Sequence, residues 1–179
     1  MANRAIGEAI QANIEAVGNP KWSAEEQAFA RKFQAAVGVP EVGLHETPTP
    51  FGTRPQSASS NDNGDVTWVV PTGAMAFPAS VPGIQYHNWQ AGVTPTMSLA
   101  HKGTVAGAKV MAASLIDLLT SAELREKART EFAGETARTK YFSLLPAETR
   151  PPVDLNREMM ERYRQAMQKF YLNKTVQLN

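Results

Sequence analysis

SLAHKGTVAGAKVMAASLIDLL, residues 98–119, has a clear helical pattern, and the predicted fold is built around it. Alanine, valine, methionine and leucine cover a wide face, which predicts a helix over about residues 102–120. Small residues recur along it and would let another backbone approach closely. They are Ala100, Gly103, Ala106 and Gly107. Tight packing explains the glycines better than a phosphate-binding loop, because the Gly-rich, Lys and Ser/Thr order of such a loop is absent.

Two further helices are predicted before this stretch and two after it. The first is amphipathic and is followed by Gly18, at the position where a left-handed residue ends a helix. Ser23 and Glu26 have the spacing of a capping box at the start of the second. The neighbouring Glu25 points about 100° away from Glu26, so the two carboxylates are assigned to structure and not to acid–base chemistry. The four helices cover about residues 3–17, 23–37, 121–133 and 152–171.

The middle of the chain is irregular. Residues 40–64 are rich in Pro, Gly, Ser, Thr and Asn, a composition that predicts a loop. Residues 65–90 contain short apolar runs bounded by Pro and Gly, which predict strands or turns. Such strands would need a partner sheet.

Composition excludes several classes of function. The chain has 179 residues, enough for one domain with a real core, and its formal net charge is +1, so no field of one sign attracts nucleic acid or anionic lipid. It has no cysteine, which removes disulfides, thiolate metal sites and cysteine nucleophiles. Lys109 and Asp117 interrupt the longest candidate for a membrane helix of about 20 residues. We expect a soluble protein without nucleic-acid or membrane partners. The expected location is the cytoplasm, and a periplasmic location stays open.

Any metal chemistry would fall to histidine and carboxylate side chains. His45 lies in the polar loop and is expected to be exposed. His87 would share a strand face with Trp89, which supports packing as readily as a site. His101 lies at a helix start, where the dipole favours the neutral, zinc-binding ring, but a capping histidine fits the position equally well. The chain has no H-x-D or H-E-x-x-H spacing, so spacing alone gives no complete metal site.

Several motifs together resemble a known enzyme family. GDVTW at 64–68, HNWQ at 87–90 and AHKG at 100–103 form a specific combination, and VGNPKWSAEEQAFAR at 17–31 adds to it. They resemble the C-terminal part of the zinc-dependent amidohydrolases and peptidases that include the aminoacylases, and within them the p-aminobenzoyl-glutamate utilisation protein B group. The resemblance covers nearly the whole chain.

The resemblance implies an α/β fold. Residues 1–179 would be the C-terminal segment of a zinc-exopeptidase-like catalytic domain, with helices around a short mixed sheet. The N-terminal half and the inserted dimerisation domain would lie outside this sequence. The implied partners are the N-terminal half of the same enzyme and further copies in a homo-oligomer.

The resemblance also implies roles for individual residues. His101 resembles the family's last metal ligand. Asp65 resembles the acidic position of a motif near the active centre, and His87 resembles the histidine of an H-S/T-W-Q run, with a substrate-contact or supporting role. The stretch SNDNGD departs from the family's Ser-Thr-Asp-Val-Gly-Asp run, so Asp62 and Asn63 receive no role. No catalytic residue is assigned to this segment.

The implied activity is hydrolysis of an amide bond in an N-acyl or N-aroyl amino acid, such as p-aminobenzoyl-glutamate. Water bound to a divalent metal, zinc or manganese, would attack the carbonyl while a glutamate moves the proton. Most of this machinery lies in the N-terminal half, so the isolated chain is expected to be inactive. Two alternatives stay open: a non-catalytic interaction or accessory module, and a structural fragment that folds by pairing with another copy.

Overall fold

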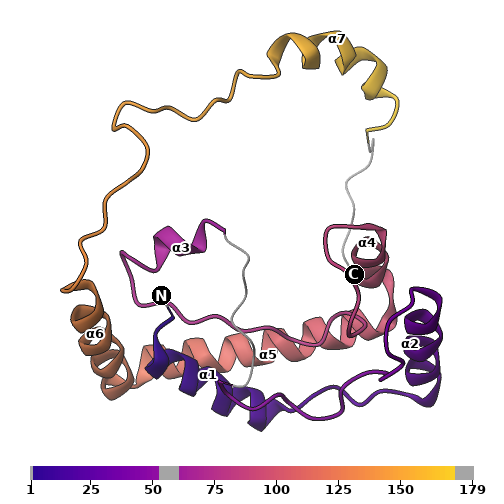
Figure 1. Cartoon of the computed structure of the whole chain (residues 1–179), viewed down its shortest axis with the longest axis horizontal. Coiled ribbons are helices and arrows are strands. Elements are labelled where there is room, and N and C mark those ends of the chain that lie inside the picture. Colours follow the sequence, from indigo (N-terminus) through magenta and orange to yellow (C-terminus); the bar gives the residue numbers. More distant parts are fainter. Residues whose placement is uncertain (1, 53–60, 172–179) are drawn as a thin grey trace. The chain divides into compact units, whose positions relative to one another are not determined.

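The computed structural model describes residues 2–52 and 61–171, and its regular elements within these ranges are all helices. The chain divides into two compact units, Met1–Tyr141, called the first unit below, and Phe142–Asn179. The helices are α1 (Arg4–Val17), α2 (Ala24–Ala36), α3 (Asn63–Val66), α4 (Trp89–Val93), the 3-10 turn η1 (Thr94–Thr96), α5 (Ser98–Thr120), α6 (Ala122–Thr136) and α7 (Arg157–Gln168) (Figure 1).

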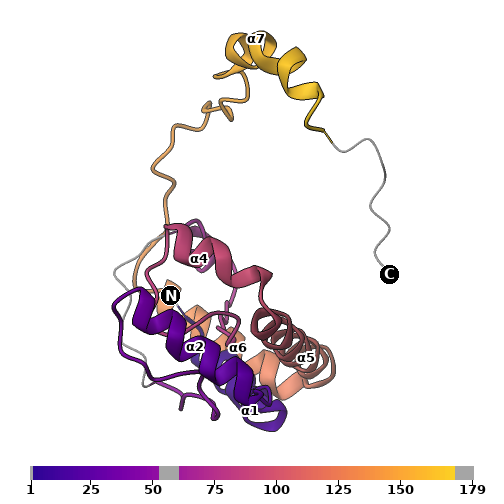
Figure 2. The same ribbon diagram turned by 90° about the vertical axis from the view of Figure 1, so that its right-hand side faces the viewer.

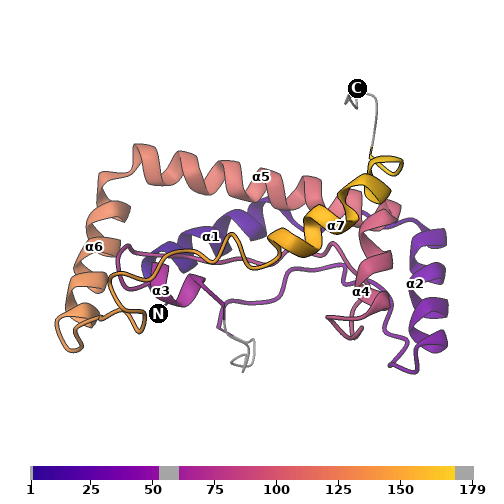
Figure 3. The same ribbon diagram turned by 90° about the horizontal axis from the view of Figure 1, so that it is seen from above.

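The longest helix, α5, has α1 lying along it (Figure 3). Gly18 ends α1 with a φ of 71°, and its N–H donates to the Ile14 carbonyl at 2.8 Å. The beginning of α1 is held by α6. There the Glu131 carboxylate accepts hydrogen bonds from the backbone N–H groups of Arg4 at 2.7 Å and Ala5 at 3.0 Å. These bonds satisfy two donors that a helix start leaves unpaired.

Two glycines of α5 bring an extended segment directly against the helix. A Cβ atom at Gly103 would lie 2.2 Å from the Pro78 carbonyl oxygen, and one at Gly107 would lie 2.6 Å from the Phe77 ring. The predicted close approach of a second backbone is therefore confirmed at Gly103.

The Gly103→Ala variant is expected to unfold more easily, by about 1–3 kcal/mol in urea titrations. Alanine gains about 1 kcal/mol of helix propensity, but the atom that it would meet is backbone and cannot rotate away. Gly134 in α6 is the control, because a Cβ there meets nothing within 4 Å. We expect Gly134→Ala to stabilise the chain, and equal effects of the two substitutions would contradict the packing described.

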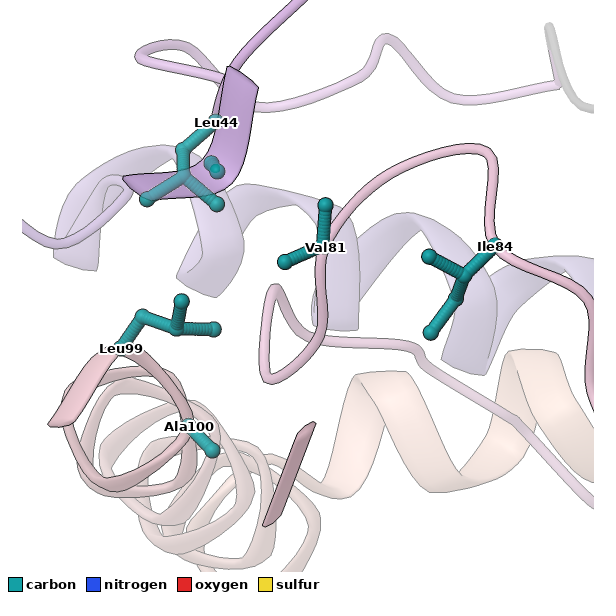
Figure 4. Close-up of a cluster of buried hydrophobic side chains, with 6 residues drawn as sticks. Leu44, Val81, Ile84, Leu99 and Ala100 are labelled. Atoms are coloured by element: carbon teal, nitrogen blue, oxygen red, sulfur yellow. The ribbon is translucent and has the colours of Figure 1, made fainter. Parts of the chain in front are cut away.

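The main buried cluster joins the beginning of α5 to α2 and to two loops (Figure 4). Leu99 and Val81 are each only 1% exposed and lie at its centre. Trp22, Phe33, Ala79 and Met97 pack around it. The cluster consists of Ala30, Leu44, Val81, Ile84, Leu99 and Ala100.

Side-chain amides of α2 hold the neighbouring loops in place. The amide oxygen of fully buried Gln34 accepts from the Gly43 N–H at 2.8 Å, and its nitrogen donates to the carbonyls of Gly43 at 3.3 Å and Pro82 at 3.0 Å. Gln27 likewise donates to the Leu44 carbonyl at 3.0 Å and accepts from the Leu44 N–H at 2.8 Å. Two glutamines thus pair with extended backbone as a neighbouring strand would.

The prediction of an α/β fold around a short mixed sheet is wrong. The described residues contain no strand, and the region 65–90 holds the end of α3 and the beginning of α4, with turns, bends and extended segments between them. Pro71, Pro78 and Pro82 remove backbone donors from this region, and its Pro82 carbonyl is taken by a glutamine amide instead. The predicted loop 40–64 also ends in the first residues of α3.

α5 is long and apolar enough to cross a membrane by length and composition, with a mean hydropathy of 1.3 and 22% of that window buried. The charged residues Lys109 and Asp117 therefore do not exclude α5 as a membrane-spanning helix by length and composition. A core helix of a soluble protein passes the same test. One side of α5 packs on α1, where the Asn13 amide donates to the Asp117 carboxylate at 2.6 Å.

Candidate functional site

The first turn of α5 contains His101, whose side chain is exposed. The N-cap of the helix is Met97, which makes no side-chain capping bond, and His101 donates its backbone N–H to the Met97 carbonyl at 3.4 Å. A capping role for the His101 side chain is therefore wrong. The ring is left available to groups outside the helix.

A shallow cavity of about 380 Å³ lies beside His101, between the end of α1 and α5. Lys102 and Lys109 line it together with His101, and no Asp or Glu is among the residues that line it. Gly18 and Asn19 form the opposite wall. The charge of Lys102 is paired with Glu26, so Lys109 makes the cavity cationic and suited to a negatively charged group.

α2 and α5, both drawn in Figure 2, are tied together next to this cavity by an ion pair between Lys102 and Glu26, whose side chains are 43% and 10% exposed. The Lys102 ammonium donates to one Glu26 carboxylate oxygen at 2.7 Å, and the Ser98 hydroxyl donates to the other at 2.9 Å. Ser23 completes the predicted capping box, with its N–H donating to Glu26 at 2.8 Å and its hydroxyl accepting from the Glu26 N–H at 3.1 Å. The capping box is confirmed.

These contacts fix the charge of Glu26. Burial raises the pKa of its carboxyl, but the hydrogen bonds from Lys102, Ser23 and Ser98, with the charge of Lys102, outweigh that effect and lower the pKa from 4.5 to about 2. Glu26 is therefore an anion throughout the physiological range. It orders Lys102 and holds the beginning of α5 on α2.

His87 has a positive φ of 61°, in the left-handed region, and an exposed side chain. The following Asn88 is the N-cap of α4, and its side chain accepts from the Gln90 N–H at 2.8 Å. His87 and Trp89 therefore do not share a strand face, because the chain turns between them and enters a helix. The left-handed backbone is a strained position for a non-glycine residue.

Asp65 lies in α3, at the end of the first unit where α1 begins, whereas α4 and the beginning of α5 lie at the other end (Figures 1 and 3). Desolvation, followed by hydrogen bonding to Asp65 and the charge of Asp65, raises the pKa of Tyr141. Tyr141 also stacks on Trp68, with ring centroids 6.2 Å apart. Asp65 is thus not brought together with His101.

Within the described ranges, no group of three His, Asp or Glu side chains could hold a metal ion. The residues present therefore do not form a metal centre by themselves. They supply at most part of a ligand set, since a catalytic zinc takes about three protein ligands.

The comparison with curated proteins finds a significant relative. It is one of the subunits of p-aminobenzoyl-glutamate hydrolase from Escherichia coli strain K12, with 27% of residues identical over 177 positions. The chain is similar to that protein. The alignment covers 84% of this chain but spans only 37% of the relative's length. The resemblance to this group that the motifs indicated is confirmed. No family model matches the chain, and no solved structure is significantly similar to it.

Sequence reasoning missed the contact between Lys102 and Glu26. The two residues lie on different helices, and only the position of Ser98 and Lys102 four residues apart on one helix face indicates a common partner. The cavity beside His101 was also missed, because its walls come from segments far apart in the sequence.

Proposed function

We propose that this chain is the C-terminal part of a metal-dependent amidohydrolase that cleaves an N-acyl or N-aroyl amino acid such as p-aminobenzoyl-glutamate. The similarity to the Escherichia coli protein supports this proposal. His101 supplies one ligand to the divalent metal, zinc or manganese. The other ligands and the catalytic groups come from polypeptide that corresponds to the part of the relative outside the alignment.

The position of His101 is compatible with this proposal. A ligand that completes a site from another segment has to be reachable, and His101 is exposed at the rim of a cavity. The cationic wall of that cavity suits the carboxylates of an acyl-amino acid. His87, with its left-handed backbone near the same end of the first unit, is assigned a substrate-contact or supporting role. The same role for Asp65 lacks support, because α3 lies at the opposite end of the first unit from the beginning of α5.

The partners belong to the same proposal. The relative is named as one subunit of a hydrolase, which supports assembly with further polypeptide. We infer that the present chain joins the missing N-terminal half and that the complete enzyme is a homo-oligomer in the cytoplasm.

The test uses the native protein, captured from its source cells through a tag on the genomic copy of this sequence. We expect it to release p-aminobenzoate from p-aminobenzoyl-glutamate and to lose this activity after treatment with a chelator. The 179-residue chain prepared alone is expected to release none. A native protein without hydrolase activity would overturn the proposal in favour of an accessory module, and turnover by the isolated chain would overturn the assignment of the missing groups to other polypeptide.

A further inference from the structure

A second and larger hollow lies within the first unit. It is a cleft of about 520 Å³ bordered by α1, one side of α5 and the chain segments 44–52 and 74–86. Its volume falls in the range of about 300–1,000 Å³ that small-molecule sites occupy. No Asp, Glu, Lys or Arg is among the residues that line it. Apart from His45, no side chain of the lining could compensate the charge of an ionic ligand.

Aromatic rings form much of the cleft wall. Phe51, Phe77 and Tyr86 line it and are 45%, 43% and 64% exposed, so their faces are not used by the core. Trp22, in the connection between α1 and α2, lines the cleft and also packs against the buried cluster. Exposed aromatic surface gathered in one concave place is typical of a binding site for an apolar ring.

The rings are held in position by their neighbours. Phe77 lies against Gly107 so closely that a Cβ there would be 2.6 Å from the ring, and Phe51 lies against Gly7, where the same distance is 3.0 Å. The Tyr86 hydroxyl lies 3.2 Å from the Ser80 hydroxyl, within hydrogen-bond distance. A ligand that binds against these rings loses little affinity, because few side chains have to become ordered when it binds.

The opposite loop is fixed by hydrogen bonds to its backbone. The indole N–H of Trp22 donates to the His45 carbonyl at 2.8 Å, and the Asn19 amide donates to the carbonyls of His45 at 3.0 Å and Thr47 at 2.9 Å. Gln11 adds a bond to the Thr49 carbonyl at 3.2 Å. These bonds keep the loop away from α5 and leave the cleft open.

The cleft adjoins the cationic cavity beside His101. Gly18, Asn19 and Ala106 contribute to the walls of both. One hollow is lined by aromatic rings and by no Asp, Glu, Lys or Arg, whereas its neighbour contains Lys109 and His101 besides Lys102, which is paired with Glu26. An N-aroyl amino acid has two ends that match the two hollows, because its ring is uncharged while its amino-acid end carries carboxylates.

We propose that the cleft binds an uncharged aromatic ring, the aroyl end of the substrate, and excludes the carboxylate end. The identity of the ring as an aroyl group rests on the proposed function. The preference for a neutral aromatic ring rests on the walls of the cleft alone.

The probe is p-aminobenzamide, which carries the ring and the amide but no charge, added to the 179-residue chain and followed by ligand-observed NMR. We expect a dissociation constant of about 1 mM, as for a good fragment. Cyclohexanecarboxamide, which is similar in size but not aromatic, is expected to bind at least about threefold more weakly. Glutamate is expected not to bind in the cleft.

The variants compare two phenylalanines of nearly equal exposure. Phe77→Ala removes a ring of the cleft wall and is expected to weaken binding of p-aminobenzamide about fivefold. Phe29→Ala removes a ring that is 42% exposed on α2 and outside the cleft, and is expected to leave binding unchanged. Tyr86→Ala serves as a second test, since the greater exposure of Tyr86 makes an effect on folding smaller. Far-ultraviolet circular dichroism checks that each variant keeps its helices.

The outcomes separate the cleft from the proposed function. Equal binding of the aromatic and cyclohexyl amides, or unchanged binding by both Phe77→Ala and Tyr86→Ala, would overturn the cleft proposal even if the native protein hydrolyses p-aminobenzoyl-glutamate. Ring-specific binding that both variants weaken supports the cleft, and together with an inactive native protein it would overturn only the proposed function.

Discussion

The His101→Ala variant of the native protein is expected to hydrolyse p-aminobenzoyl-glutamate at least about 100-fold more slowly than the unmodified protein. Removal of one ligand from a site that takes about three weakens its hold on the metal. We therefore also expect the metal content per polypeptide, measured by mass spectrometry, to fall. The His101 side chain is exposed and does not cap its helix, so the melting temperature of the isolated chain should not change.

Thr104→Ala is the control for this prediction. Thr104 is an exposed residue of the same helix and lines neither hollow. We expect it to keep full activity and metal content. If His101→Ala behaved in the same way, His101 would not be a ligand, and its place in the AHKG motif would reflect only the folding of α5.

Acid is expected to destabilise the first unit through Glu26. The pKa of Glu26 is lowered in the folded chain to about 2, so the folded state favours the carboxylate, and this stabilisation is present above the unfolded pKa of 4.5. It is lost as the pH falls from about 5 towards 2. A shift of this size corresponds to about 3 kcal/mol in the free energy of unfolding, measured by urea titration at several pH values.

The Glu26→Gln variant should flatten this pH dependence, because glutamine has no proton to gain, and should lower stability at neutral pH by leaving Lys102 without its partner. Glu25→Gln is the matched control, since Glu25 is the adjacent, exposed carboxylate of the same helix turn. It should keep the pH dependence of the unmodified chain. A Glu26→Gln curve with the same slope would place the acid-sensitive group elsewhere.

Local signals predicted the five longer helices but not the short helices α3 and α4. Ser23 and Glu26, three residues apart, form the reciprocal hydrogen bonds of a capping box, and Gly18 ends α1 through its own backbone conformation. Such features depend on residues that are close in the sequence, so they can be recognised without knowing the fold.

The predicted strands failed for the opposite reason. A strand is defined by a second backbone that pairs with it, and the apolar runs of residues 65–90 do not say which partner they meet. In the first unit they meet the glycines of α5 and the amide of Gln34. The extended conformation was thus indicated by the sequence, but the pairing was not.

The candidate site was likewise predicted only in part from the sequence. Motifs identified His101, His87 and Asp65 as candidates, and their roles stay predictions. Motifs did not indicate that Asp65 lies at the other end of the first unit from His101, nor that Lys102 reaches Glu26 on another helix. The rings of the aromatic cleft come from separate segments of the chain, and no spacing rule connects them.

The amides of Gln27 and Gln34 have a consequence for how the loops can vary. Their hydrogen bonds go to backbone atoms of Gly43, Leu44 and Pro82, which almost every residue type presents in the same way. The loops can therefore exchange many of their side chains without changing their path. Gly43 is the exception, because it has a φ of 72° and a Cβ there would lie 2.5 Å from the Gln27 amide oxygen. Loop sequences that retain a glycine at this point could then be exchanged between relatives to alter what the adjoining cleft accepts.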